Sequence, residues 1–278
     1  MTVIYTNTGA LYAQQAINTN QRALSRVMEQ LSTGKRINNP EDDVAGLAIS
    51  TRLTTQIRAL NQAVRNANDG ISLVQTAEGA TEEVTNMLQR MRELAIQSIN
   101  DTNGAFDHSG LDIEFQKLAA QIQSIASQTQ WNGTNLLDKT GGASGVFKFQ
   151  VGANAGETIA VTFANMTTKS TGILSTIATQ TITSSAKSTS ALSAIFSALD
   201  TMSLERAKMG AVISRLQFAG DNLANVSAKT QESRSRIEDT DYSIATTELA
   251  KRNIIQQAAQ AMLAQANQMP NMVLQLLK

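Results

Sequence analysis

Residues 53–74, LTTQIRALNQAVRNANDGISLV, decide the fold class, because their apolar side chains recur in alternating steps of four and three. The members of this row are Leu53, Ile57, Leu60, Val64, Ala67, Ile71 and Val74. Such heptad spacing places one apolar stripe along a helix and predicts packing against other long helices. The row lies in a stretch from about Val44 to Ile99 that we expect to be helical, and past Gly79 it restarts in a shifted phase.

The same rhythm recurs on both sides of this stretch and predicts a mainly α fold. An upstream stripe runs from Ala10 to Leu31, a third helix from about Leu111 to Thr129, and later rows from Leu192 to Leu223 and from Ile255 to Leu276. Segment 102–110 contains turn-forming glycines, so we expect it to make the second and third helices antiparallel. The predicted class is long antiparallel helices in a coiled-coil-like bundle, with the N- and C-terminal helices paired.

The start of the long second helix carries a recognisable signal. Asn39 is a suitable N-cap, and Pro40 suits the first helical position, where its missing N–H is not needed. The acidic run 41–43 would then lie at the positive end of the helix dipole. We therefore expect the helix to be capped by Asn39, after a break over residues 32–38.

The period changes to two between Val146 and Phe163, which predicts one small β-hairpin. Phe147, Phe149 and Val151 alternate on one arm, and Ile159, Val161 and Phe163 on the other. Gly152 to Gly156 separates the arms and supplies the turn. The next stretch, 165–190, is mostly Ser and Thr without a clear period, so we expect a short surface excursion.

The composition excludes several classes of function. The 278 residues hold 23 Lys and Arg against 23 Asp and Glu, so the basic surplus of a nucleic-acid binder is absent. No apolar run approaches the roughly 18 residues that a spanning helix needs, so we expect no membrane insertion. The chain has no Cys and one His. We expect no catalytic residues, no metal and no cofactor.

The two ends of the chain share an unusual property, which is the absence of charged side chains from residues 1–21 and 253–277. A surface helix normally carries charges on its outer face, and a helix without them is usually enclosed. One such pair of helices cannot bury enough apolar surface by itself, so we expect it to be buried against copies of the same chain. The alternatives are a plain antiparallel bundle and a chance absence of charge.

Several ordered motifs resemble bacterial flagellin. They are Gln30–Asn38 with Asp42–Ile49, then Asn66–Ser72, Gln75–Ala80, Leu88–Ala95 and Trp131–Leu137, the hairpin Gln150–Thr158, and the C-terminal Ala261–Gln268 and Val273–Leu277. Pro40 and Trp131 depart from the usual pattern, and the middle is too short for outer variable domains. The chain therefore resembles a short flagellin that has the two inner domains only.

The resemblance implies a structural subunit that self-assembles into the helical bacterial flagellar filament for swimming motility. Residues 1–42 and 236–278 would form a terminal inner-tube coiled coil, and residues 43–235 an outer-rod helical domain. The residues expected in the inner tube are Ile4, Ile17, Leu24, Ile255, Met262, Val273 and Leu276. The resemblance further implies type III export with an uncleaved signal, an extracellular location, and as partners a secretion chaperone, the filament cap and hook-junction proteins.

The resemblance also assigns two sets of residues outside the inner tube. A surface that similar flagellins offer to a Toll-like innate immune receptor matches Gln89, Arg90, Leu94, Gln97 and Glu114. Subunit contact is the simpler role for Arg90 and Glu114. The hairpin residues Phe149, Val151, Gly152, Gly156 and Ile159 match the region proposed to switch the filament between two packings.

Two other functions stay open at this point. A hook–filament junction protein of the same family would share the terminal helices but should match less of Asn66 to Leu94. A hydrolase would have to use His108, which lies between Asp107 and Ser109. Adjacent residues do not form a triad by sequence alone, so we expect His108 to lie in a solvated polar turn.

Overall fold

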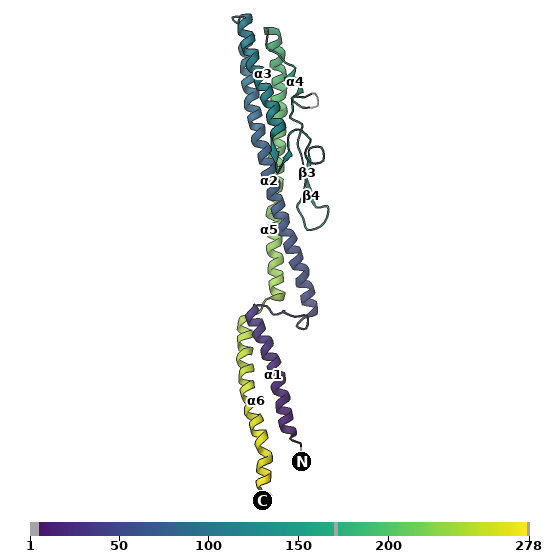
Figure 1. The fold of residues 1–278 in the computed structure, drawn as a ribbon, viewed down its shortest axis with the longest axis vertical. Helices are drawn as coiled ribbons and strands as arrows, with labels where there is room; N and C mark the ends of the chain where they lie inside the picture. The colour runs from purple at the N-terminus through teal and green to yellow at the C-terminus, as the bar shows by residue number, and fades with distance from the viewer. Residues whose placement is uncertain (1–5, 170–171, 277–278) are drawn as a thin grey trace. The chain divides into compact units, whose positions relative to one another are not determined.

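A computed structural model describes residues 6–169 and 172–276 (Figure 1). It contains the helices α1 (Thr8–Thr33), α2 (Val44–Ile99), α3 (Ala105–Gln128), α4 (Ser175–Ala178), α5 (Ser185–Glu238) and α6 (Tyr242–Leu276). The strands are β1 (Gln130–Trp131), β2 (Thr134–Asn135), β3 (Val146–Gln150) and β4 (Thr158–Thr162). The mainly α class with long antiparallel helices is thereby confirmed.

The chain divides into two compact units, residues 1–57 with 228–278 and residues 58–227, and each is described by itself. The expected division into an inner-tube and an outer-rod domain, with boundaries at 42/43 and 235/236, stays a prediction.

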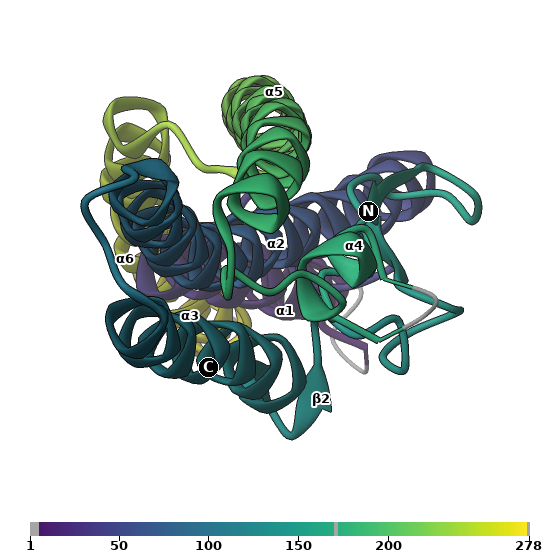
Figure 2. The same cartoon turned by 90° about the horizontal axis from the view of Figure 1, so that it is seen from above.

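In the unit 58–227, residues of α2, α3 and α5 pack into one apolar core (Figure 2). Its fully buried members include Val84, Leu88 and Met91 from α2, Phe115 and Ile122 from α3, and Ile195 and Met202 from α5. These residues repeat at heptad-like intervals, so each helix presents one apolar stripe to the other two.

Side-chain contacts fix the direction of the helices in this unit. On α2 and α3, Arg90 pairs with Glu114, and further along α2, Ser98 meets the earlier residue His108. From the first pair to the second, the residue number rises on α2 and falls on α3. The two helices are therefore antiparallel. The predicted antiparallel neighbours α2 and α3 are confirmed.

The predicted β-hairpin forms from β3 and β4, whose antiparallel register pairs Phe147 with Val161 and Phe149 with Ile159. Ile159 and Val161 are buried, while alternate residues of β4 are exposed. The hairpin lies close to α2, because a Cβ built on Gly70 would lie 3.2 Å from both Phe149 and Leu216. Glycine at this position therefore allows the strand to approach the helices.

The expectation of a single hairpin is wrong, because β1 and β2 form a second antiparallel pair. The turn between them is Asn132-Gly133, and both residues have positive φ, 48° and 76°. This dipeptide is the preferred turn of a two-residue hairpin. The strands were missed because they contain two residues each, too few to show a period.

Segment 165–190 is not the surface excursion that its Ser- and Thr-rich composition suggested. Met166, Leu174 and Ile177 are fully buried in the core of the unit. Side chains of α3 hold its backbone: Gln123 accepts from the Thr168 N–H at 2.9 Å, and Asp112 accepts from the Ile182 N–H at 2.8 Å. Scattered apolar residues anchor this segment, and such anchors have no periodic signal.

The cap of α2 and the starts of α3 and α5 differ from the expectation. Asp43, not Asn39, caps α2, since its carboxylate accepts from the Gly46 N–H at 2.8 Å. α3 begins at Ala105, six residues early, because the Asp107 carboxylate accepts from the Gly104 N–H at 2.9 Å. α5 begins at Ser185, where a run of small polar residues carries no apolar row.

In the unit formed by residues 1–57 and 228–278, α1 and α6 run side by side (Figure 1). The segment between α1 and α2 is tied to the end of α5 through Glu238. Its carboxylate is 2.5 Å from the Lys35 ammonium and accepts from the Ser50 hydroxyl at 2.5 Å. These two hydrogen bonds, with Lys35 the larger cause, hold the pKa of Glu238 below its ordinary value.

A pH dependence follows from this lowered pKa. A carboxylate whose pKa is lower in the folded state stabilises the fold above its ordinary pKa of 4.5, and that contribution is lost as the pH falls through the folded value. We expect Glu238→Gln to lower the melting temperature at about pH 7, with the difference shrinking at about pH 3. Thermal unfolding across this range measures it, with Glu82→Gln on the exposed face of α2 as control. A difference that is equal at both pH values would contradict the assignment.

Candidate polymerisation surfaces

The α1–α6 pair leaves much of its own apolar surface uncovered. In this pair the buried side chains of α1 are Asn20, Leu24 and Val27. The exposed large apolar side chains of the two helices include Leu11, Tyr12, Met28, Ile254, Ile255, Met262 and Met269. Together with the absence of charge from residues 6–21 and 253–269, this makes a surface suited to a protein partner.

The residues expected in the inner tube fall into different environments. Ile17 is half-buried and Leu24 is buried within the pair. Ile255 and Met262 are exposed, Met262 at 65 % of its surface. Ile4 lies outside the described residues. The same holds for the side chains of Val273 and Leu276. Ile17 and Leu24 thus lie in the contact between the two helices, whereas Ile255 and Met262 keep exposed surface that is open to a partner.

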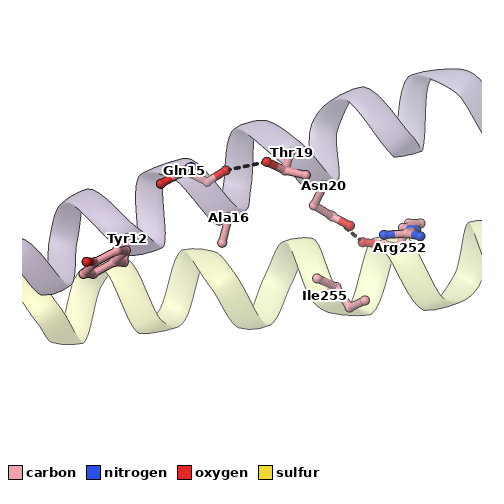
Figure 3. Close-up of a pocket in the computed structure, with 7 residues that line it drawn as sticks. All are labelled: Tyr12, Gln15, Ala16, Thr19, Asn20, Arg252 and Ile255. Atoms are coloured by element: carbon pink, nitrogen blue, oxygen red, sulfur yellow. Dashed lines mark hydrogen bonds between the residues drawn. The ribbon is translucent and has the colours of Figure 1, made fainter. Parts of the chain in front are cut away.

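A shallow groove of about 400 Å³ runs between the two helices (Figure 3). Tyr12, Gln15, Ala16, Thr19 and Asn20 line it from α1, and Arg252 and Ile255 from α6. The Arg252 guanidinium is paired with Glu248 at 2.7 Å, so its charge is already neutralised. Tyr12, Ala16 and Ile255 give the groove apolar surface for a side chain of a partner, and the polar lining residues offer hydrogen bonds.

On the unit 58–227, the residues expected to meet a receptor are only partly brought together. Gln89, Arg90, Gln97 and Glu114 are exposed. Arg90 donates to Glu93 at 3.0 Å and to Glu114 at 3.0 Å, and these hydrogen bonds raise the pKa of the guanidinium. Sequence reasoning missed Glu93 and the exposed apolar side chains Ile96, Phe106 and Ile113 of α2 and α3. For the three apolar residues, the available sequence signal was their position outside the heptad row of their helix.

Leu94 differs from the other members of this set, because it is 1 % exposed and belongs to the apolar core. It therefore has no surface to offer to a partner while the helices are folded. Its position one turn after Arg90 suggested a shared face, but Leu94 lies inside the core stripe of α2 and Arg90 lies outside it.

Burial of Leu94 gives a direct prediction for stability. We expect Leu94→Ala to lower the free energy of unfolding by about 2–5 kcal/mol, because it leaves a cavity in the core. The exposed Gln97→Ala on the same helix should stay within about 0.5 kcal/mol of the parent chain. Urea unfolding followed by circular dichroism measures both. A Leu94→Ala variant as stable as the parent would mean that this part of the core is not packed as described.

The expected switch residues lie together where the hairpin covers α2 and α5. Ile159 packs with Ala67 and Leu216, and Val151 packs near Leu60 and Leu223. Asn66 of α2 donates to the Gln150 carbonyl at 3.0 Å and fixes the end of β3. The hairpin is therefore held to two helices at once.

Two glycines close the loop of the hairpin. A Cβ on Gly152 would collide with the Glu157 side chain, and Gly156 has a φ of 93°. Glu157 accepts from the Asn154 amide at 2.9 Å and from its backbone N–H at 3.0 Å, and these bonds lower the pKa of the carboxyl group. Side chains larger than hydrogen would open this loop.

His108 is not in a solvated turn, because it lies in the first turns of α3 and is half-buried. Its Nδ1 is 2.7 Å from the Ser98 hydroxyl, which also donates to the Ile182 carbonyl at 2.7 Å. Ser98 is 0 % exposed, so its oxygen has no access to a substrate. The serine–histidine pair instead joins α2, α3 and the segment before α5.

Within residues 6–169 and 172–276, no group of three or more His, Cys, Asp or Glu side chains is placed to hold a metal ion. The surfaces described above consist of exposed apolar side chains, amides and a few paired charges.

Comparison with known proteins identifies the kind of subunit. The family model "Bacterial flagellin N-terminal helical region" matches residues 4–141, and "Bacterial flagellin C-terminal helical region" matches residues 192–277. The chain belongs to the bacterial flagellin family. The flagellin of Halalkalibacterium halodurans is 45 % identical over 276 residues, covering 99 % of this chain and 100 % of that protein. The flagellin of Bacillus subtilis is 38 % identical, covering 98 % of each.

A solved structure of a putative flagellar hook-associated protein from Vibrio parahaemolyticus has a TM-score of 0.60 and covers 71 % of this chain and 100 % of its own. Its identity is 15 %, so the likeness shows the fold alone. The flagellins of Halalkalibacterium halodurans and Bacillus subtilis match nearly the whole chain, and the hook–filament junction alternative is not favoured.

Flagellins are structural proteins, and this chain is a subunit of the extracellular flagellar filament. Within the described parts of the chain, none of the helices combines the length and the apolar character that a membrane crossing needs.

Proposed function

We propose that the α1–α6 pair is the surface through which this flagellin polymerises, and that it forms the inner tube of the filament. The proposal places residues 1–42 and 236–278 in the tube and residues 43–235 in an outer rod. The observation that supports it is the set of exposed apolar side chains, such as Met262, on the charge-free stretches 6–21 and 253–269 of the two helices. Burial of such a surface lowers the free energy, and no charged side chain in these stretches has to be buried with it.

The energetics favour a polymer. Full burial of one Leu or Met side chain contributes about 1.5–3 kcal/mol, and several such side chains are exposed on each pair. A contact between different surfaces of identical subunits that does not close on itself generates an open helical filament. Many modest contacts repeated along the polymer then hold the subunits together.

A single charge tests this surface. Met262→Asp should leave the isolated subunit folded, because the side chain is 65 % exposed there, and should abolish filaments, because assembly would bury an unpaired carboxylate. Electron microscopy and sedimentation measure the polymer. The control is Ala250→Asp, which is also exposed on α6 but lies beside Glu248 and Lys251, where charge is already present.

In this test, filament yield equal to that of the parent chain would exclude Met262 from the interface. Equal loss in both variants would mean that α6 tolerates no added charge anywhere, and it would not support a special role for the apolar row.

The same surface explains the partners we propose for the subunit before and during assembly. A secretion chaperone that covers the apolar row of α6 would prevent premature polymerisation inside the cell. Export through the type III apparatus would use the N-terminal segment as an uncleaved signal. The filament cap and the hook-junction proteins would meet the same helix pair, because they occupy the ends of the polymer that this pair builds.

We further propose that the exposed residues around Arg90 contact other proteins, either neighbouring subunits or a Toll-like innate immune receptor. Support comes from Gln89, Gln97 and Glu114, which are exposed beside it, and from the ion pairs that hold the guanidinium in place. Leu94 would act indirectly, by holding α2 against the core.

Receptor contact is tested on the soluble subunit. We expect Arg90→Ala combined with Glu114→Ala to weaken binding to the receptor ectodomain by about tenfold or more, as for paired charges at an interface centre. Helicity and melting temperature should not change, because both side chains are exposed. Arg92→Ala, also exposed on α2, is the control. Unchanged receptor binding, with filament assembly impaired, would assign the surface to subunit contact alone.

The hairpin is our proposed switch between two lateral packings of the filament. Its residues Phe149, Val151, Gly152, Gly156 and Ile159 contact both α2 and α5 or shape the loop, so a small shift of the hairpin would be felt by two helices of the rod. Packed interfaces change between discrete arrangements rather than deform continuously, which suits a filament that supercoils.

A further inference from the structure

The apolar contacts between α1 and α6 do not specify how the two helices are aligned along their length. The seam of α1 consists of Ala10, Ala13, Ile17, Leu24, Val27 and Leu31, interrupted once by Asn20. A heptad row of small and aliphatic residues looks similar to itself after a shift of seven residues, so several alignments bury comparable apolar surface.

Asn20 is the exception in this row. It occupies a seam position and is 4 % exposed, so its amide is removed from water. Its Nδ2 donates to the Arg252 carbonyl at 2.9 Å and to the Gln256 side-chain oxygen at 3.0 Å. A buried amide is tolerated when it finds such partners and is costly when it does not.

Two other cross-helix hydrogen bonds agree with the same alignment. Near the start of α1, Asn7 donates to the Ala266 carbonyl at 2.8 Å, and near its end, the Leu31 carbonyl accepts from Tyr242 at 3.3 Å. From the first bond to the second, the residue number on α1 rises by 24 and the residue number on α6 falls by 24. Both bonds use a backbone carbonyl, and every residue of α6 or α1 has one, so they discriminate less by residue type than the Asn20–Gln256 contact does.

A shift of α6 by one heptad breaks the contact of Asn20 with Gln256. In either direction, the residue brought to the place of Gln256 is a leucine, Leu249 or Leu263. The buried amide of Asn20 would then face an aliphatic side chain that accepts no hydrogen bond. At this position the shifted alignments lose a side-chain hydrogen bond that the aliphatic seam residues cannot replace.

We propose that Asn20, paired with Gln256, is the residue that sets the register of the terminal helix pair. The inference rests on the proposed function of this pair, because a helical polymer requires every subunit to present the same composite surface. A mixture of alignments would place different α6 side chains beside the groove that Tyr12 and Ala16 line. Register, rather than stability, is what the amide contributes.

A second observation separates register from stability. The Oδ1 atom of Asn20 is buried and has no hydrogen-bond partner among the described residues. An incompletely paired amide in an apolar seam lowers stability relative to a well-packed leucine. Asn20→Leu should therefore retain or raise the stability of the pair while it removes the penalty on the shifted alignments.

Disulfide trapping in the full chain tests the proposal, and the absence of native cysteine makes the result unambiguous. A Cβ built on Gly9 lies 3.9 Å from the Ala266 Cβ, a separation that a disulfide spans. The double variant Gly9→Cys with Ala266→Cys reports the observed register. Gly9→Cys with Ala259→Cys reports an alignment shifted by one heptad. The product of an intrachain bond is separated from interchain products by its migration on a non-reducing gel.

In the parent background we expect the 9–266 bond to exceed the 9–259 bond by about tenfold, which one or two side-chain hydrogen bonds supply. Asn20→Leu, and separately Gln256→Leu, should bring the two yields close to each other. Ile17→Leu changes an apolar seam residue and should leave the preference intact. Circular dichroism checks that each variant keeps its helices.

The proposal is overturned if Asn20→Leu keeps the strict preference for the 9–266 bond, or if the parent forms neither intrachain bond. Filament formation is scored on the same samples by electron microscopy, which keeps the two hypotheses apart. Filaments with scrambled bonds in the parent would reject the register role and leave the polymerisation surface standing. A parent chain that forms only the 9–266 bond but no filament would support the register role and reject the polymerisation surface.

Discussion

The absence of charge from both terminal stretches constrains what the α1–α6 pair does. The stretches 6–21 and 253–269 of the helix pair expose Leu11, Tyr12, Ile254 and Met262 to water and contain no charged side chain. Burial of these stretches on association would lower the free energy without burying a charge from them. The unit 58–227 is the opposite case, since Leu88, Phe115 and Ile195 are enclosed by its own helices. The unit 58–227 encloses its apolar core, whereas the α1–α6 pair leaves large apolar side chains exposed.

Apolar contacts alone do not fix how two elements are aligned, and in this chain polar contacts fix the alignment. Asn20 and Gln256 distinguish one alignment of the terminal helices from its neighbours. Glu238 joins Lys35 and Ser50, so the short segment between α1 and α2 is fixed against the end of α5. In both places, a few oriented hydrogen bonds select one arrangement among several that would bury similar apolar area.

The sequence predicted what depends on periodic burial and missed what depends on single contacts. The heptad row of Leu53 to Val74 predicted α2, and the alternation around Phe149 predicted the main hairpin, because both patterns report one buried face. The start of α3 was not predicted, because the carboxylate of Asp107 places it six residues before the apolar row. The packing of segment 165–190 escaped because Met166 and Ile177 are buried without a period. Among the proposed site residues, Arg90 and Met262 are exposed in the structure, whereas Leu94 is buried, which depends on how α2 packs in the core.

The hydrogen bond between His108 and Ser98 has a practical consequence. This imidazole is the only one in the chain, and it lies where α2, α3 and the segment preceding α5 meet. Its nuclear magnetic resonance signals are therefore free of overlap from any second histidine. A ring proton of His108 thus reports, without any added label, whether the contact between α2, α3 and the segment before α5 is closed or open. The same signal can be followed in the monomer and during growth of the polymer.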